Sequence, residues 1–224
     1  NTTAGISIVG YTGTNGTGTI GHSLGVTPQA YLVKRRDNAS DWRIYHQGMG
    51  PTKAMKLNEN GGPATNSVYW NDTAPTSTTV SLGTDTDLNG STDKYVAFIF
   101  SNVEGFSKFG LYTGVIKDND TSPSHGNGDG TYVYTGFRPA FLIVKKLANE
   151  FMPMFDSKRD PDNVCEARLF PAYNYAESVE GVVDFLSNGF KARNGGGQSI
   201  ISSPGTEYIY FAFAESPFKN SRAR

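Results

Sequence analysis

The chain has 224 residues, with 20 basic and 21 acidic side chains that give a formal net charge of −1. Nucleic acids and anionic membrane surfaces are bound by concentrated positive charge, so this balance predicts neither kind of partner. The single Cys165 excludes an internal disulfide framework and a cysteine-built zinc site, and no apolar run approaches the roughly 18 residues that a membrane-spanning helix needs.

The composition favours an all-β fold. Apolar residues make up 37 % of the chain, while Gly (26), Phe (14) and Tyr (12) are abundant beside many Thr, Ser and Asn. Aromatic and β-branched residues are enriched in strands, and Gly and Asn are typical of the tight turns between them. We therefore expect many short strands.

In chain order, the first strand is expected over residues 6–11, and the pair Asn15-Gly16 predicts a hairpin turn to a second strand over 17–20. Residues 30–35 read as a buried strand that enters after Pro28 and ends in basic residues near solvent. Those cations are interpreted as a solvated strand end or a subunit contact. The run 42–46 alternates between two faces, with Arg43 and Tyr45 sharing one of them.

Further along, residues 53–57 are expected to form an edge strand, and residues 68–70 and 78–82 a pair of strands around a loop. The run 95–100 is apolar on both faces, which predicts a central strand.

The second half of the chain repeats these features in the same order. Pro28 and the strand that follows it return as residues 139–146, and the motif Tyr11-Thr12-Gly13 returns as Tyr112-Thr113-Gly114. The strand over 42–46 has a counterpart in 151–156, where Pro153 confines it to a sheet edge, and the strand 95–100 has one in 208–213. Such ordered landmarks indicate an internal duplication.

We therefore predict two tandem antiparallel β-sandwich-like units, one over residues 1–105 and one over residues 106–224. A hairpin with an Asn188-Gly189 turn belongs to the second unit, as does a polar loop over 118–130. Residues 168–178 are the one place where a short helix is expected.

Motifs for chemistry are sparse. Residues 85–90, Asp-Thr-Asp-Leu-Asn-Gly, match the first half of a calcium loop, but Val96 stands where the bidentate Glu is needed, so a hairpin loop is predicted. His22, His46 and His125 lie on separate segments without metal spacing, and Cys165 reads as a buried thiol. No nucleophile, base and orienting group converge in the sequence. We expect no metal, no cofactor and no enzymatic activity.

Aromatic residues beside polar turns are the remaining candidates for a binding site, and they are Tyr69, Trp70, Tyr173 and Tyr175. An aromatic ring next to Asn and Asp suits a glycan, because the ring packs on the sugar face and the polar groups bond its hydroxyls. The alternative is that these rings cap the open ends of the sandwiches or pack against another subunit.

The sequence resembles an uncharacterised repeat domain that is common in structural proteins of marine tailed bacteriophages, often labelled tail-fibre proteins. The resemblance covers nearly the whole chain. Its motifs are Tyr11-Thr12-Gly13, the stretch 21–28 (Gly-His-Ser-Leu-Gly-Val-Thr-Pro), the basic run 33–36, Trp42 with Tyr45-His46, the link 103–110 (Val-Glu-Gly-Phe-Ser-Lys-Phe-Gly), the stretch 134–141 and the hairpin 184–191.

This resemblance implies a virion component and supplies no catalytic or ligand residues. The leading hypothesis is a non-enzymatic tail-fibre or spike module on the exterior of the particle, assembled as a homo-oligomer with other virion proteins and contacting a host surface glycan. The alternatives are a capsid decoration (head-fibre) protein and a carbohydrate-binding module.

Overall fold

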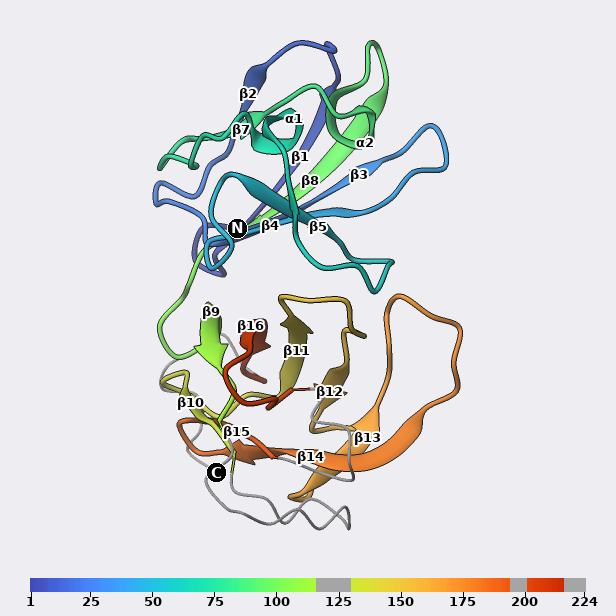
Figure 1. Cartoon of the computed structure of the whole chain (residues 1–224). Helices are drawn as coiled ribbons and strands as arrows, with labels where there is room; N and C mark the ends of the chain where they lie inside the picture. Colours follow the sequence, from blue (N-terminus) through green and yellow to red (C-terminus); the bar gives the residue numbers. More distant parts are fainter. Residues whose placement is uncertain (116–129, 194–200, 216–224) are drawn as a thin grey trace. The chain divides into compact units, whose positions relative to one another are not determined.

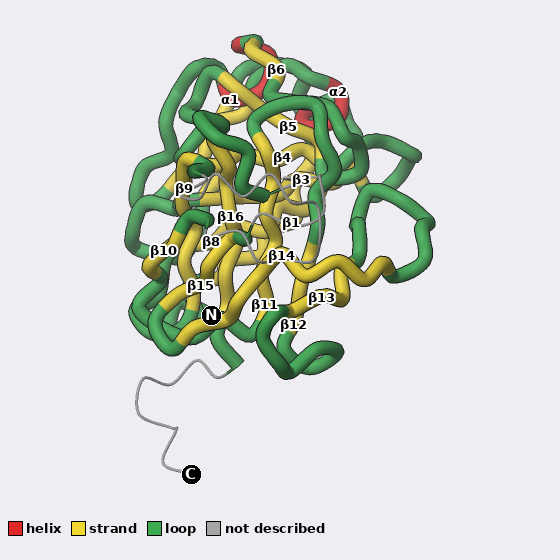
Figure 2. The backbone as a smooth tube through the Cα atoms, turned by 60° about the horizontal axis from the view of Figure 1, so that its bottom comes forward, coloured by secondary structure: helices red, strands yellow, loops and turns green. Residues whose placement is uncertain are grey.

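The computed structural model describes residues 1–115, 130–193 and 201–215. Strands and loops make up nearly all of it (Figure 2), which confirms the all-β class. Contacts divide the chain into two compact units, Asn1–Val103 (unit 1) and Glu104–Arg224 (unit 2). The predicted loop over 118–130 lies almost entirely outside the described residues.

Unit 1 consists of a large sheet covered on one face by a smaller one. Its elements are β1 (Ile6–Thr12), β2 (Gly18–Gly21), β3 (Ala30–Arg35), β4 (Arg43–His46), β5 (Lys53–Lys56), β6 (Ala64–Thr65), α1 (Ser67–Trp70), β7 (Thr79–Leu82), α2 (Thr86–Asn89) and β8 (Lys94–Phe100). The large sheet has the order β1-β8-β3-β4-β5-β6, and β2 pairs with β7. Figure 1 shows β2, β7 and both short helices on the same side of the large sheet.

Unit 2 consists of two four-stranded antiparallel sheets, ordered β12-β11-β16-β9 and β10-β15-β14-β13 (Figure 1). The strands are β9 (Ser107–Thr113), β10 (Tyr132–Tyr134), β11 (Phe141–Lys146), β12 (Met154–Asp156), β13 (Cys165–Arg168), β14 (Ser178–Leu186), β15 (Gly189–Ala192) and β16 (Glu207–Phe213). The predicted Asn188-Gly189 hairpin joins β14 to β15, and β12 is an edge strand, as the proline before it requires.

The two units share one strand order. In unit 1 the run β1-β8-β3-β4 matches β9-β16-β11-β12 in unit 2. The registers agree as well, because β3 and β8 pair from Ala30–Phe100 to Arg35–Tyr95, while β11 and β16 pair from Phe141–Phe213 to Lys146–Tyr208. The repeated landmarks of the sequence thus stand at equivalent positions in two similar sheets.

A stacked tyrosine pair occupies the same place in each unit. Tyr11 and Tyr95 pair across β1 and β8 with ring centroids 5.2 Å apart, and Tyr112 and Tyr208 pair across β9 and β16 at 5.1 Å. We call these two arrangements the tyrosine pairs. Burial raises the pKa of all four phenols, so they remain protonated and able to donate.

The hydroxyls of the tyrosine pairs bind equivalent backbone groups. Tyr11 donates to the carbonyl of Leu88 and Tyr112 to that of Ile201, both at 2.6 Å. Tyr95 and Tyr208 each accept, at 2.8 Å, the N–H of the residue five positions before them, Gly90 and Ser203. Each pair therefore fastens the segment that leads into the central strand.

The side chains on the inner faces of the sheets form one core in each unit. In unit 1 the core lies between β1, β8, β3, β4 and β5 on one side and β2, β7, Trp70 and Leu88 on the other. In unit 2 it lies between the two four-stranded sheets. Each core is rich in aromatic rings, which supply much of the buried apolar area of a β-sandwich.

Two parts of unit 1 differ from the prediction. Residues 68–70 form part of helix α1 rather than a strand, because Asn66 caps its first turn and Asn71 adopts the left-handed conformation (φ 52°) at its end. Residues 85–90 are not a hairpin loop, since Asp85 caps helix α2 by accepting the N–H of Asp87.

Three smaller expectations are also wrong. The strand β2 pairs with β7 in the smaller sheet and not with β1 across the Asn15-Gly16 turn. The strand β5 is not an edge, because β6 pairs beyond it. No helix forms over 168–178 in the described part of unit 2, where β13 ends and β14 begins.

The lysines at the strand ends bind loop carbonyls within their own unit. Lys34 donates to the carbonyl of Ser40 at 2.8 Å, and the equivalent Lys145 donates to the carbonyls of Ala148 and Glu150. Lys145 is fully buried, and burial lowers its pKa to about 8. The interpretation of these cations as solvated strand ends is therefore wrong for Lys145.

Candidate functional site

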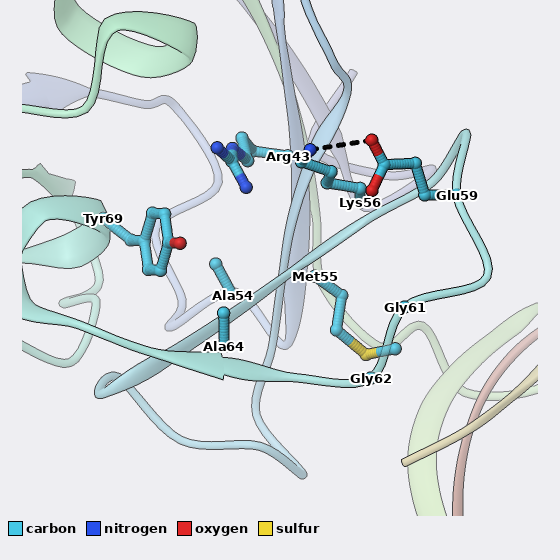
Figure 3. A pocket seen from close by; sticks show the side chains of 9 residues that line it. All are labelled: Arg43, Ala54, Met55, Lys56, Glu59, Gly61, Gly62, Ala64 and Tyr69. Atoms are coloured by element: carbon cyan, nitrogen blue, oxygen red, sulfur yellow. Dashed lines mark hydrogen bonds and ion pairs between the residues drawn. The ribbon is translucent and has the colours of Figure 1, made fainter. Parts of the chain in front are cut away.

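A pocket of about 310 Å³ opens in unit 1 beside β4, β5 and α1. Its walls consist of two cations, one carboxylate, one aromatic ring and small or apolar residues, and the full set is Arg43, Ala54, Met55, Lys56, Glu59, Gly61, Gly62, Ala64 and Tyr69 (Figure 3). We call it the Arg43 pocket. Its volume falls at the small end of the range of ligand pockets, roughly 300–1,000 Å³.

Arg43 lies at the start of β4 and points toward the core side of the sheet. Its register partner on β3 is the buried Val33, and the guanidinium reaches Asp85 at 3.1 Å and Asp87 at 2.9 Å. The same guanidinium lies over the ring of Tyr69, 4.9 Å from its centroid. The two short helices supply all three of these partners. Asp85 is the cap of α2 and Asp87 lies in its first turn, while Tyr69 belongs to α1.

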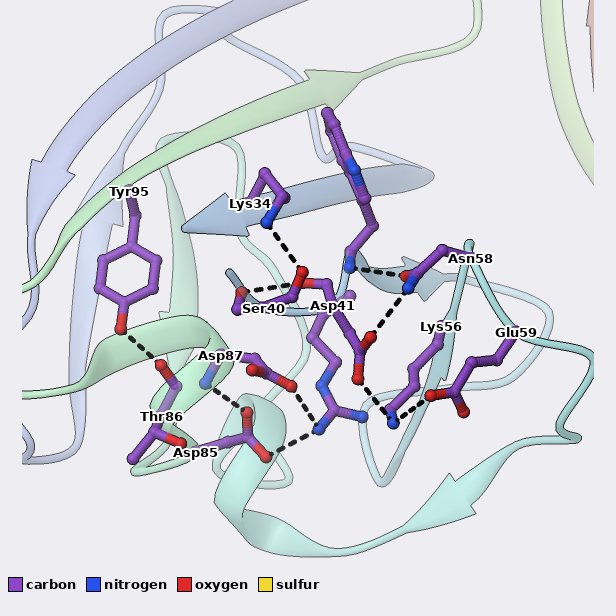
Figure 4. Close-up of polar contacts among 12 residues, drawn as sticks. Lys34, Ser40, Asp41, Lys56, Asn58, Glu59, Asp85, Thr86, Asp87 and Tyr95 are labelled. Atoms are coloured by element: carbon purple, nitrogen blue, oxygen red, sulfur yellow. Dashed lines mark hydrogen bonds and ion pairs between the residues drawn. The ribbon is translucent and has the colours of Figure 1, made fainter. Parts of the chain in front are cut away.

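A second group of charges lies beside the first, because Lys56 on β5 is the register partner of Arg43 on β4. Lys56 on β5 binds Asp41 at 2.6 Å and Glu59 at 2.7 Å, and Asn58 donates to Asp41 at 2.8 Å (Figure 4). Hydrogen bonds from Lys56 and then Asn58 lower the pKa of Asp41, so this carboxylate stays ionised. Burial raises the pKa of Asp85, and the charge of Arg43 opposes that rise.

Unit 2 lacks these charges at the equivalent place. Ile44 and Met154 hold the same position opposite β3 and β11, so the counterpart of Arg43 is Pro153. The segments around β12 and β13 carry instead a group of four aromatic residues, which are Phe151, Phe170, Tyr173 and Tyr175. We call this group the aromatic cluster. Tyr173 and Tyr175 stack at 4.9 Å, and Tyr175 is 57 % exposed.

The other titratable groups that drew attention in the sequence have structural surroundings. Burial raises the pKa of Cys165 to about 12, which keeps the thiol protonated and unreactive at neutral pH. The imidazole of His46 accepts the N–H of Gly48 at 3.0 Å, and Asp156, its counterpart in unit 2, accepts the N–H of Lys158 at 3.0 Å. A histidine and an aspartate therefore hold the same kind of turn.

The described residues lack two features that would indicate a function. They contain no group of three or more His, Cys, Asp or Glu side chains arranged to hold a metal ion. None of their helices is both long enough and apolar enough to span a membrane.

Comparison with known proteins adds one match. A family model described as a domain of unknown function (DUF7483) covers residues 1–217. The chain belongs to this family. No curated protein and no solved structure matches the chain significantly. Membership of DUF7483 thus accounts for both units and assigns no activity to either.

The four predicted glycan residues have different surroundings in this DUF7483 chain. Tyr69 is partly buried and lines the Arg43 pocket. Trp70 is not available to a ligand, because it is fully buried in the core of unit 1 and its indole N–H donates to the carbonyl of Lys53 at 2.9 Å. Tyr173 and Tyr175 do lie together, in the aromatic cluster of unit 2. Trp70 was predicted to be exposed because the polar residues Asn71 and Asp72 follow it in the sequence.

Sequence reasoning missed Arg43 and Lys56 as residues of a site. A signal for Arg43 was present, since alternation in strand 42–46 places it on the same face as Tyr45, and that face is the core. A guanidinium on a core face needs buried carboxylates, and the acidic run Asp85-Thr86-Asp87 supplies them. The two runs lie far apart in sequence, so only the fold brings them together.

Proposed function

We propose that the chain is a non-enzymatic structural module on the exterior of a bacteriophage particle, as part of a tail fibre or spike that touches the host surface. We also propose that it arose by internal duplication of one β-sandwich unit. In this role the module provides a stable scaffold, works together with other virion proteins, and assembles with further copies of itself.

The observation that carries this proposal is the repetition of the tyrosine pair. Strand order, register, ring stacking and the bonds to Leu88 and Ile201 recur in both units. Tandem units of one fold suit fibrous and surface assemblies, in which a sturdy repeated domain carries variable loops. The motif resemblance to phage structural proteins points in the same direction.

The use of the buried titratable groups also supports a scaffold. His46, Asp156 and Lys145 bind backbone groups of turns and loops, and the thiol of Cys165 stays protonated. An acid–base or nucleophilic mechanism needs such groups aimed at a common point where a substrate fits. Here His46, Asp156 and Lys145 bind backbone groups that lie within the fold itself.

Electron microscopy of purified particles that carry a tagged copy of the chain tests the location. We expect label on tail fibres or spikes. Label at regular positions on the capsid would contradict the fibre assignment and support a decoration protein instead. Absence of the chain from infectious particles would overturn the virion proposal altogether.

A further inference from the structure

We propose that the Arg43 pocket binds one neutral sugar residue of a glycan chain. As a biological role, this rests on the proposed contact with a host surface. As chemistry, it rests on the pocket alone and can be tested on the isolated chain. The ligand class follows from the size of the pocket, from its mixed walls and from the pairing of its charges.

The shape of the pocket suits a ring-shaped ligand. Figure 3 shows the methyl groups of Ala54 and Ala64 between the ring of Tyr69 and the side chain of Met55. These small side chains leave the space of about 310 Å³ open beside the partly buried ring of Tyr69. An aromatic ring beside an open space suits the C–H face of a pyranose ring.

Part of the wall of the pocket is polar. The cations Arg43 and Lys56, the carboxylate of Glu59 and the backbone of Gly61 and Gly62 stand around the opening. Together they offer donors and acceptors to one ligand. A sugar hydroxyl both donates and accepts, so adjacent hydroxyls can bond with a cation and a carboxylate at the same time.

The net charge of the side chains around the pocket disfavours an anionic ligand. Arg43 already binds Asp85 and Asp87, and Lys56 already binds Asp41 and Glu59. Two cations thus face four carboxylates, and the group carries a formal negative charge. An acidic sugar would meet this excess and would have to displace an existing partner, whereas a neutral sugar adds hydrogen bonds without breaking ion pairs.

The polar side chains of the pocket are held in place by their neighbours. A wall that is already ordered loses little conformational freedom when a ligand binds. Asp85 is held by capping α2, and Asp41 is held by Asn58. The side chain of Arg43 is only 11 % exposed, and its guanidinium binds Asp85 and Asp87 and lies over the ring of Tyr69. The polar groups thus stand ready before the ligand arrives.

The test uses the whole chain on a printed array of neutral and acidic glycans, followed by titration calorimetry with the best oligosaccharide. We expect a neutral hexose-containing glycan to bind, and Tyr69→Ala to weaken it at least tenfold. Tyr69→Phe, which keeps the ring, should stay within about threefold of the parent. Thermal unfolding of each variant shows whether the loss reflects the pocket or the fold.

The control is Tyr134→Ala, which removes from unit 2 a tyrosine that also lies under a cation, Lys108, but is 59 % exposed and lines no part of the Arg43 pocket, and it should leave the affinity unchanged. Loss of binding in Tyr175→Ala with full binding in Tyr69→Ala would overturn the proposal by moving the site to the aromatic cluster. Preference for acidic glycans, or no binding to any neutral glycan, would also overturn it.

The two proposals fail separately. A chain that binds neutral sugars through Tyr69 but is absent from particles retains the pocket and rejects the virion role. A chain found on fibres that binds no sugar on the array does the reverse.

Discussion

Units 1 and 2 have the same sheet order and the same tyrosine pair, yet they differ at one strand. In unit 1 the strand β4 begins with Arg43 and leads to a charged pocket, whereas in unit 2 the equivalent position is Pro153 and the neighbouring loops form an aromatic cluster. The framework is therefore set by residues that bind backbone, and the individual surface is set by residues at the strand ends. Where the two units agree, the side chains stabilise the fold; where they differ, a function specific to one unit should be sought.

A second difference concerns the layer that covers the main sheet. Unit 1 closes its core with a two-stranded sheet and two one-turn helices, and unit 2 closes it with a four-stranded sheet. Trp70 is the largest fully buried side chain and has its place on α1. Both tryptophans of the chain, Trp42 and Trp70, belong to unit 1, so tryptophan fluorescence reports on that unit, while circular dichroism reports on both.

The largest effect is expected from Trp70→Ala. Removing a fully buried indole should lower the free energy of unfolding by about 3–5 kcal/mol, because it opens a cavity against Tyr31 and Tyr45 and leaves the carbonyl of Lys53 without its donor. Urea unfolding followed by the fluorescence of Trp42 measures it. A loss below about 1 kcal/mol, the usual range of surface changes, would contradict the assignment of Trp70 to the core.

The tyrosine pairs provide a matched test of equivalence between the units. Tyr11→Phe and Tyr112→Phe each remove one hydroxyl that donates to a backbone carbonyl at 2.6 Å. Each should cost about 1–3 kcal/mol, because a carbonyl loses its partner in a largely buried place. Urea unfolding followed by circular dichroism gives both values. A clear loss in one variant and none in the other would break the equivalence.

The lowered pKa of Lys145 leads us to expect that the stability of unit 2 rises with pH. Its pKa is about 8 in the folded chain against 10.5 for an ordinary lysine, so the unfolded chain binds more protons between these values. Stability should therefore increase by about 1 kcal/mol from pH 8 to pH 9. The thiol of Cys165, whose folded pKa is raised, opposes this rise as soon as the unfolded thiol begins to ionise, at about pH 8 to 9, so the contribution of Lys145 is the difference from a variant that lacks its ammonium. Chemical denaturation at each pH measures the slope.

The control for this slope is Lys145→Met, which keeps an unbranched side chain one atom shorter and removes its charge. The variant should show no rise between pH 8 and pH 9. An unchanged slope in the variant would mean that another group causes the pH dependence.

The smallest effect is expected at the turn that follows β12. Asp156 accepts the N–H groups of Lys158 and Arg159 at 3.0 and 2.9 Å. Asp156→Ala should cost about 1 kcal/mol by removing this local cap, and Asp156→Asn, whose amide oxygen still accepts, should cost less. Thermal unfolding distinguishes the two. Equal losses would show that the ion pair with Arg159 is the more important interaction.

Much of the framework could be predicted from local sequence. The run after Pro28 forms the central strand β3, the Asn188-Gly189 pair forms a hairpin, and Pro153 precedes an edge strand. In each case a few adjacent residues decide the structure, through backbone geometry, through a missing N–H or through a continuous apolar run.

What could not be predicted depends on contacts that are distant in sequence. A helix of one turn has no periodicity to detect, so residues 68–70 were predicted as a strand and residues 85–90 as a hairpin loop, although each forms or contains a capped turn of helix. The Asn15-Gly16 pair suggested a local hairpin, but the strand after it crosses to the other sheet to pair with β7. Arg43 needed two carboxylates from the far side of the unit, and no local rule connects them.

The tyrosine pairs also bear on how such a chain can diverge. Their hydroxyls bind the backbone at Leu88, Gly90, Ile201 and Ser203, so the side chains at those four positions do not take part in these bonds. Leu88 and Ile201 are constrained for another reason, because their side chains are buried in the cores, and a side chain at Gly90 would meet Asp93. Insertions can still lengthen the loops before these segments while the two rings continue to hold them. Two units held in this way can differ widely in their loops and retain one architecture, which leaves each unit free to acquire its own surface.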